Sequence, residues 1–176
     1  MANLREPKNH QVLLKAFYKS NLHSSNWTLH FVGKNYQDDY SENLTKLVKE
    51  LNIEESVFLY DVKSDIANIL SQATIGVLCS TYEGFPVTLL EYGLAKLPVI
   101  ASSVGFCSEI IKDKERGLLF ESNNVDALQN CLITLSNDAF FCVKVADNLH
   151  TFVVTHYSKS AVISELIQNY QSLVSK

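Results

Sequence analysis

The chain has 176 residues, of which 47% are hydrophobic and 19% charged, and its formal net charge is −4. This composition is typical of a soluble globular protein with one full core, and the negative charge argues against non-specific nucleic-acid binding, which requires a basic surface. No apolar run approaches the roughly 20 residues that span a bilayer, and the first residues show no signal-peptide pattern. We therefore expect a cytoplasmic protein.

Strand-like and helix-like segments alternate along the chain. Short apolar runs between polar turns predict strands over residues 27–32, 56–60, 74–79, 97–102 and 117–120. Apolar residues spaced three and four apart predict helices after Asn9, over 40–51, after Ser64, over 86–96 and 107–112, around 128–135, over 139–153 and around 163–170. Asn9 and Ser64 are the expected N-caps. This order predicts an α/β fold with a parallel sheet and helices on both faces, in one domain over residues 1–176.

Parallel sheets of this kind bind ligands beyond the carboxyl ends of their strands. The loops at that edge are expected at residues 4–8, 33–36, 60–63, 80–86 and 102–107. The charged and glycine residues that stand out in the sequence gather in these loops. The residues alone therefore indicate a ligand site at this edge.

The stretch from Ser80 to Glu91 follows the most apolar predicted strand. Gly84 lets a backbone approach a ligand closely, and Pro86 suits the first turn of a helix because its missing N–H is not needed there. The free amides of that helix start favour a phosphate. Glu83 and Glu91 would repel a phosphate, so we expect them to accept hydrogen bonds from hydroxyl groups on either side of it.

The cysteines and histidines show no pattern of a metal site. The four cysteines form no pair at zinc-ligand spacing and lie in apolar stretches, which favours buried thiols. None of the five histidines pairs with an acid or a cysteine at ligand spacing. We expect no metal and no other cofactor.

Several motifs in order carry a family resemblance. They are Ser80-x-x-Glu83-Gly84-Phe85-Pro86-x-x-Leu89-Leu90-Glu91, Leu97-Pro98-Val99-Ile100-Ala101-Ser102, Gly105-x-x-x-Glu109, Arg116-Gly117-Leu118-Leu119 and Asn3-Leu4-Arg5-x-x-Lys8-Asn9. Together they resemble the glycosyl transferases group 1, family four, which are retaining enzymes with two Rossmann-like domains (the GT-B fold). The resemblance covers nearly the whole chain, and each motif alone would be weak.

The resemblance implies that the chain is the donor-binding half of a longer hexosyltransferase-type enzyme, without the N-terminal half that binds the acceptor. That enzyme would move a sugar from a UDP- or GDP-linked donor to a glycan or lipid-linked acceptor, with retention of configuration, in cell-surface polysaccharide biosynthesis. The full enzyme would associate with the inner face of the membrane, and the isolated chain would be inactive. The metal-binding Asp-x-Asp motif of other sugar transferases is absent from the sequence.

The resemblance also implies a role for each site residue. Glu83 would hold the hydroxyls of the transferred sugar as the catalytic acid-pair member, and Glu91 would accept from the ribose hydroxyls. Arg5 and Lys8 would bind the phosphates, since Arg offers a planar fork and Lys a compact charge.

Backbone groups would complete the donor site. The amides of Phe85, Val87 and Thr88 would meet the phosphates or the sugar, next to Gly84. The base would lie against the loop that contains Val62, bordered by Gly33.

The sequence departs from the family at three positions. Asn3 stands at the usual position of the phosphate-binding arginine, so Arg5 would have to replace it. Lys96 and Phe106 stand where relatives usually have glycine, and Phe106 would narrow the cleft.

Two alternatives remain open from the residues. A nucleotide-sugar epimerase shares the fold, but it usually needs histidines and further acids in the cleft. A non-enzymatic module that binds a nucleotide or a protein partner has no need of both Glu83 and Glu91.

Overall fold

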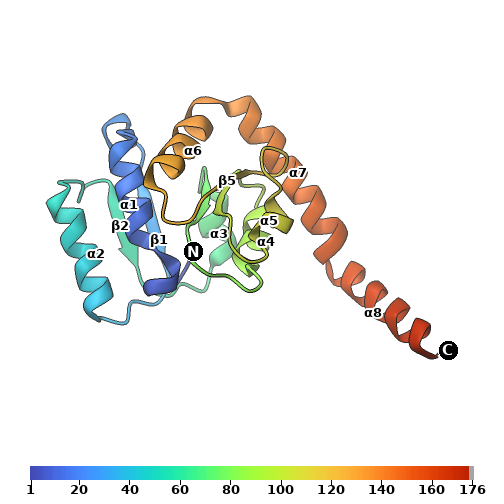
Figure 1. Ribbon diagram of the computed structural model, residues 1–176. Coiled ribbons are helices and arrows are strands. Elements are labelled where there is room, and N and C mark those ends of the chain that lie inside the picture. Colours follow the sequence, from blue (N-terminus) through green and yellow to red (C-terminus); the bar gives the residue numbers. More distant parts are fainter. Residues whose placement is uncertain (175–176) are drawn as a thin grey trace.

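The computed structural model describes residues 1–174 and contains two parallel β-sheets (Figure 1). The two-stranded sheet consists of β1 (Leu29–Val32) and β2 (Val57–Tyr60). The second sheet has the order β3-β4-β5 and consists of β3 (Gly76–Leu78), β4 (Val99–Ser102) and β5 (Leu118–Phe120). In its central strand, Ile100 lies opposite Val77 and Leu118. All five strands predicted from apolar runs are present; each begins one or two residues later than expected, and β3 also ends one residue earlier.

Residues 2–4 run beside β1 without forming a full strand. The Ala2 amide donates to the Val32 carbonyl at 3.0 Å, and the Leu4 amide donates to the Lys34 carbonyl at 2.9 Å. Gly33 permits this close approach, because a Cβ there would overlap the Ala2 backbone. The predicted parallel α/β architecture is thus confirmed, with its strands divided between two sheets.

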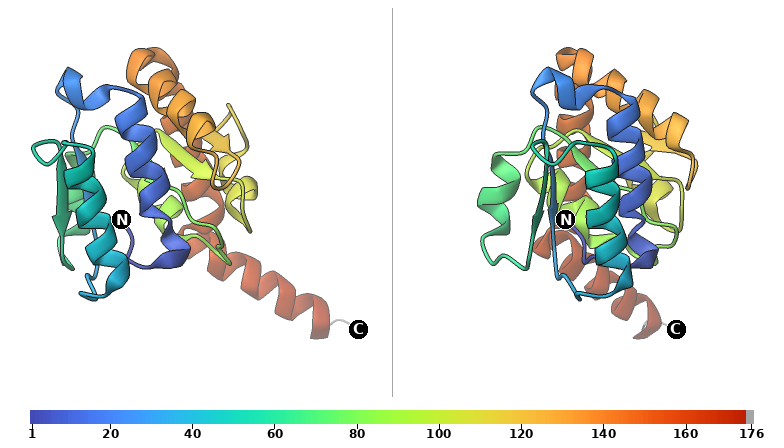
Figure 2. Two further views of the ribbon diagram at one scale, coloured as in Figure 1. Left: turned by 60° about the vertical axis from the view of Figure 1, so that its left-hand side comes forward. Right: turned by 90° about the vertical axis from the view of Figure 1, so that its left-hand side faces the viewer.

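Eight α-helices and two short 3-10 turns connect the strands of the described chain. The helices are α1 (His10–Lys19), α2 (Asp39–Glu50), α3 (Ile66–Ser71), α4 (Val87–Leu94), α5 (Cys107–Ile111), α6 (Val125–Asn137), α7 (Ala139–Tyr157) and α8 (Lys159–Val174). The 3-10 turns are Glu6–Lys8 and Leu22–Ser25. In the right-hand view of Figure 2, α1 and α2 lie on one side of β1 and α3 on the other.

The caps of the helices differ in detail from the prediction. Asp65, not Ser64, caps α3 by accepting from the Asn68 amide, because its carboxylate lies directly before the first turn. Asn9 does precede α1, but its side chain donates to Asn123 at 2.9 Å and caps no amide. Pro86 lies just before α4 and not within its first turn.

Two clusters of buried side chains form the core. One gathers around the β1–β2 sheet, α1, α2 and α6, and includes Leu14, Phe31 and Leu44. The other lies between β4 and the helices α4, α5 and α7, and includes Leu89 and Ile110. Residues of β4 belong to both clusters, with Ile100 in the first and Val99 and Ala101 in the second.

Helix α8 projects away from the body of the domain (Figure 1). Its apolar side chains are exposed, namely Val162, Ile163, Leu166, Ile167, Tyr170 and Leu173. No helix within residues 1–174 combines the length and hydropathy needed to cross a membrane.

Candidate functional site

Lys8 and Glu83 form an ion pair where β3 ends. Lys8 Nζ lies 2.5 Å from Glu83 Oε1, although 75 residues separate the two in sequence. The side chains are 19% and 10% exposed, so the pair is largely withdrawn from water. The 3-10 turn before α1 brings Lys8 to this position, and the loop after β3 brings Glu83. Two residues predicted to bind opposite parts of one ligand are therefore in direct contact.

The start of α4 offers unused backbone donors. Asp or Asn side chains cap α2, α3, α6 and α7, whereas no side chain caps α4. The amides of Phe85 and Thr88 donate to no acceptor among the described residues, while the Val87 amide donates to the Phe85 carbonyl at 3.1 Å. These amides and the positive end of the helix dipole can hold an anion.

Two loops are locked together beside Glu83. Gly105 lies against the Glu83 carbonyl oxygen and has a φ of +49°, a combination that only glycine tolerates without strain. The Phe85 ring packs 5.5 Å from the Phe106 ring and 5.6 Å from the Tyr157 ring, centroid to centroid. Both phenylalanines remain partly exposed. Phe106 therefore packs on Phe85, in the loop that carries Glu83.

Glu91 lies on α4, near the Met1 ammonium group. Burial lowers the pKa of this ammonium group to about 6, while the negative charge of Glu91 acts in the opposite direction. Lys8 also acts on the same group, so Glu91, Lys8 and, through it, Glu83 share one neighbourhood. The ammonium itself donates to the Tyr92 hydroxyl at 2.8 Å.

The remaining predicted residues are more dispersed. Arg5 is exposed, and its side chain forms no hydrogen bond or ion pair with the described residues. Val62 is 64% exposed, and its amide donates to the Asp61 carboxylate at 2.7 Å. Gly33 lies against residues 2–3 and not in an open loop. The structure thus brings Lys8, Glu83 and the α4 amides together, and leaves the predicted base-binding loop open to solvent.

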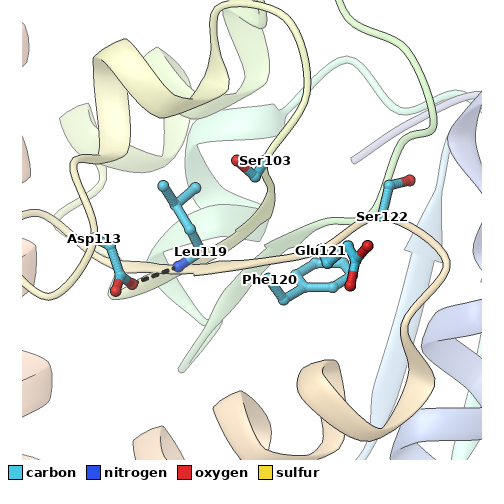
Figure 3. A pocket seen from close by; sticks show the side chains of 6 residues that line it. All are labelled: Ser103, Asp113, Leu119, Phe120, Glu121 and Ser122. Carbon is cyan, nitrogen blue, oxygen red and sulfur yellow. Dashed lines mark hydrogen bonds between the residues drawn. The ribbon is translucent and has the colours of Figure 1, made fainter.

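A shallow hollow of about 590 Å³ lies next to this site, along β5 (Figure 3). It is lined by Ser103, Asp113, Leu119, Phe120, Glu121 and Ser122. In Figure 3, Asp113 accepts from the Leu119 amide at one end, and Glu121 and Ser122 lie at the other. None of the predicted site residues lines it, but the Ser122 hydroxyl reaches the Ser80 carbonyl at 3.4 Å.

Sequence reasoning missed two residues that support the site, Ser102 and Ser122. Each stands at or just after the carboxyl end of a parallel strand, which is the edge where ligands bind. Their position at strand ends could have indicated these two serines.

The thiols have no reactive character. All four cysteines are free, and burial raises the pKa of Cys79 to about 12 and that of Cys107 to about 11. A thiol with such a pKa is a poor nucleophile at neutral pH. Within residues 1–174, no three His, Cys, Asp or Glu side chains are grouped as metal ligands.

Comparison with known families decides the assignment. Residues 1–151 match the family model of the glycosyl transferases group 1. The chain belongs to the glycosyl transferases group 1 family. The resemblance read from the acid-pair motif is thereby confirmed.

Curated group 1 glycosyltransferases and their relatives share sequence with this chain. UDP-Gal:alpha-D-GlcNAc-diphosphoundecaprenol alpha-1,3-galactosyltransferase of Escherichia coli is 32% identical over 89 residues, which are 51% of this chain and 23% of that protein. An uncharacterized glycosyltransferase of Haemophilus influenzae is 29% identical over 144 residues, covering 80% of this chain and 39% of that protein. This group 1 domain therefore spans less than half the length of these two relatives.

Two solved structures share the fold of this chain. The C-terminal domain of a glycosyl transferase group 1 family protein, LpcC, from Francisella tularensis is 26% identical with a TM-score of 0.83, covering 90% of this chain and 84% of that one. Anabaena HepE in complex with UDP is 20% identical with a TM-score of 0.91, covering 98% of this chain and 47% of that one. The Rossmann-like fold of the group 1 domain is thus established.

Proposed function

We propose that this group 1 domain binds the nucleotide-diphosphate sugar donor of a glycosyltransferase that transfers a sugar to a glycan or lipid-linked acceptor. The observation that carries the proposal is the contact between Lys8 and Glu83 beside the uncapped start of α4. A cation, free amides and a carboxylate lie within one small region. These are the groups that a diphosphate joined to a sugar requires.

Each group has a defined part in this proposal. The amides of Phe85 and Thr88, just before and at the start of α4, and the Lys8 ammonium neutralise the diphosphate as it leaves. Glu83 holds hydroxyls of the sugar and fixes its orientation while the anomeric bond breaks. Glu91, farther along α4, accepts from the ribose hydroxyls. Arg5, directly before the 3-10 turn that carries Lys8, adds a second cation.

The relatives support the nature of the substrates. HepE has been crystallised with UDP and with UDP-glucose, and the Escherichia coli relative is named for a UDP-galactose donor and a diphosphoundecaprenol acceptor. We propose that the longer enzyme acts at the inner face of a membrane, in polysaccharide or lipid-linked glycan synthesis. We further propose that transfer retains the anomeric configuration, and that the acceptor binds outside residues 1–176. The chain alone then binds donor but transfers no sugar.

Calorimetric titration with UDP, GDP and ADP, each with and without a sugar, tests the proposal. We expect one nucleoside diphosphate to bind. Its monophosphate should bind at least about tenfold more weakly, because it lacks the second phosphate that the backbone amides and Lys8 are proposed to hold. Glu91→Gln should weaken UDP but not 2′,3′-dideoxy-UDP, which lacks the ribose hydroxyls. Glu50→Gln, which alters an exposed surface ion pair on α2, is the matched control. Absence of binding by all three diphosphates would contradict the proposal.

The named alternatives make different predictions. An epimerase would convert the free UDP-sugar into its epimer without an acceptor, which chromatography of the nucleotide sugar detects. A protein-binding module would leave all nucleotides unbound. The family match and the names of the relatives favour transfer over both.

A further inference from the structure

Three serines converge behind Glu83. Ser80 follows β3, Ser102 ends β4 and Ser122 follows β5, so each lies at the carboxyl end of one strand of the second sheet. The Ser102 hydroxyl donates to the Ser80 carbonyl at 2.6 Å, and the Ser122 hydroxyl donates to the same oxygen at 3.4 Å. Ser80 and Ser102 have no exposed surface. The backbone at Ser80 is therefore held from two neighbouring strands.

Ser80 in turn holds Glu83. The Ser80 hydroxyl donates to Glu83 Oε1 at 2.7 Å, and the Lys8 ammonium binds the same oxygen. The other carboxylate oxygen, Oε2, accepts no hydrogen bond from the described residues. Two donors on one oxygen fix the plane of the carboxylate and leave the second oxygen for a ligand.

A bound diphosphate would affect the two donors to Glu83 Oε1, Lys8 and Ser80, differently. Lys8 is also the cation proposed to bind the diphosphate, and its long flexible stem lets the ammonium turn toward it. The Ser80 hydroxyl is buried on a short side chain, and among the described residues it donates to Glu83. Once a diphosphate draws Lys8 away, Ser80 is the protein donor that keeps Glu83 in place.

We propose that Ser80 is a positioning residue for the sugar, which turns Glu83 so that Oε2 accepts from a sugar hydroxyl of the bound donor. This inference rests on the proposed function and adds to it a named orienting group. Ser102 and Ser122 act through Ser80, since they fix the backbone from which its hydroxyl projects.

Affinities for UDP and for a panel of UDP-glucose, UDP-galactose and UDP-N-acetylglucosamine test this role. The measured quantity is the ratio of the dissociation constant of UDP to that of the tightest UDP-sugar. In Ser80→Ala we expect UDP to bind within about twofold of the wild-type value and the ratio to fall about five- to tenfold, the size of one lost charge-assisted hydrogen bond. A purely structural role of Ser80 would weaken UDP and UDP-sugar equally.

Two further variants complete the experiment. Ser103→Ala removes a hydroxyl from the neighbouring loop, where it pairs with Ser108 at 3.1 Å, and should leave the ratio unchanged. Ser102→Ala, which leaves the Ser80 hydroxyl present, should lower the ratio by a smaller factor and serves also if Ser80→Ala does not fold. A UDP-sugar preference of wild-type size in both Ser80→Ala and Ser102→Ala overturns the inference and leaves the proposed function standing. A wild-type chain that binds no nucleotide overturns both.

Discussion

The backbone of Gly105 lies directly against the carbonyl oxygen of Glu83, so that a methyl group on Gly105 would overlap that oxygen. The φ of +49° at Gly105 adds backbone strain for any other residue. This contact fixes the loop after β4 against the loop that carries the proposed sugar-binding acid. The position of Glu83 therefore depends on a glycine at residue 105.

Gly105→Ala should therefore destabilise the domain and displace Glu83. We expect the free energy of unfolding in urea to fall by about 1–3 kcal/mol, because the backbone must shift and adopt a strained conformation. Gly84→Ala is the matched control, since a Cβ at Gly84 meets nothing within 4 Å, and should change stability by less than about 0.5 kcal/mol. Equal stabilities of the two variants would show that the loops are not locked at Gly105.

The ion pair between Lys8 and Glu83 should show strong energetic coupling. Either Lys8→Met or Glu83→Gln leaves the partner's charge in a mostly buried place, and each should lower the unfolding free energy by roughly 1–3 kcal/mol. The double variant should recover about 1 kcal/mol or more of the summed loss. Lys19→Met with Asp126→Asn, an exposed pair at 2.6 Å, is the control and should couple weakly. Additive losses at Lys8 and Glu83 would contradict a buried pair.

His10 should make the stability of the domain depend on pH. Burial first, and then the positive charge of the Met1 ammonium, lower the pKa of His10 from 6.5 to about 4. Below pH 6.5 His10 becomes protonated in the unfolded chain, whereas in the folded chain it stays neutral until the pH reaches about 4. The unfolding free energy should thus fall by up to about 3 kcal/mol as the pH drops through this window.

Urea unfolding from pH 7.5 to pH 4 checks this expectation. The slope attributable to His10 should disappear in His10→Gln, whose amide can still accept from the Tyr40 hydroxyl that lies 3.0 Å from His10 Nδ1. His156→Gln, at an exposed histidine on α7, controls for the loss of a histidine elsewhere. Parallel curves for the wild type and His10→Gln would show that His10 is not buried in its neutral form.

The guanidinium group of Arg116 packs on the Phe152 ring. Its guanidinium carbon lies 3.6 Å from the centroid of the Phe152 ring, and one terminal nitrogen donates to the Glu109 carbonyl at 2.9 Å. Its Nε atom is buried without a partner among the described residues, which offsets part of that gain.

Arg116→Met keeps a long apolar side chain at this position and removes both the unpaired Nε donor and the bond to the Glu109 carbonyl. We expect it to change the unfolding free energy by no more than about 1 kcal/mol, whereas Arg116→Ala should lower it by about 2–4 kcal/mol through lost packing. Thermal and urea unfolding of both variants give these values. A loss in Arg116→Met as large as that in Arg116→Ala would mean that the charge itself stabilises the domain.

The order of strands and helices was readable from the sequence because the apolar residues switch between the two periods. The same pattern left the helix starts uncertain at Ser64 and Asp65, since either side chain can cap and only the local backbone decides. The strands are divided between two sheets by their backbone pairing, and no periodicity of apolar residues predicts which strands pair.

The sequence predicted the residues of the site but not their contacts. The acid pair and Lys8 stand in motifs with fixed spacing, whereas the contact of Lys8 with Glu83 depends on two loops 75 residues apart. Ser102 and Ser122 were missed because a serine at a strand end is also common in ordinary turns. Tyr157 packs on Phe85 only because α7 ends beside that loop.

The most direct test of the diphosphate seat at α4 follows individual backbone amides by NMR while UDP is added. The amides of Gly84, Phe85 and Thr88 should shift on addition of UDP, and uridine, which lacks both phosphates, should leave them in place. In Glu83→Gln the phosphate-dependent shifts should persist, because the amides and not that carboxylate bind the phosphates. Binding of UDP that leaves these three amides unshifted would contradict the account.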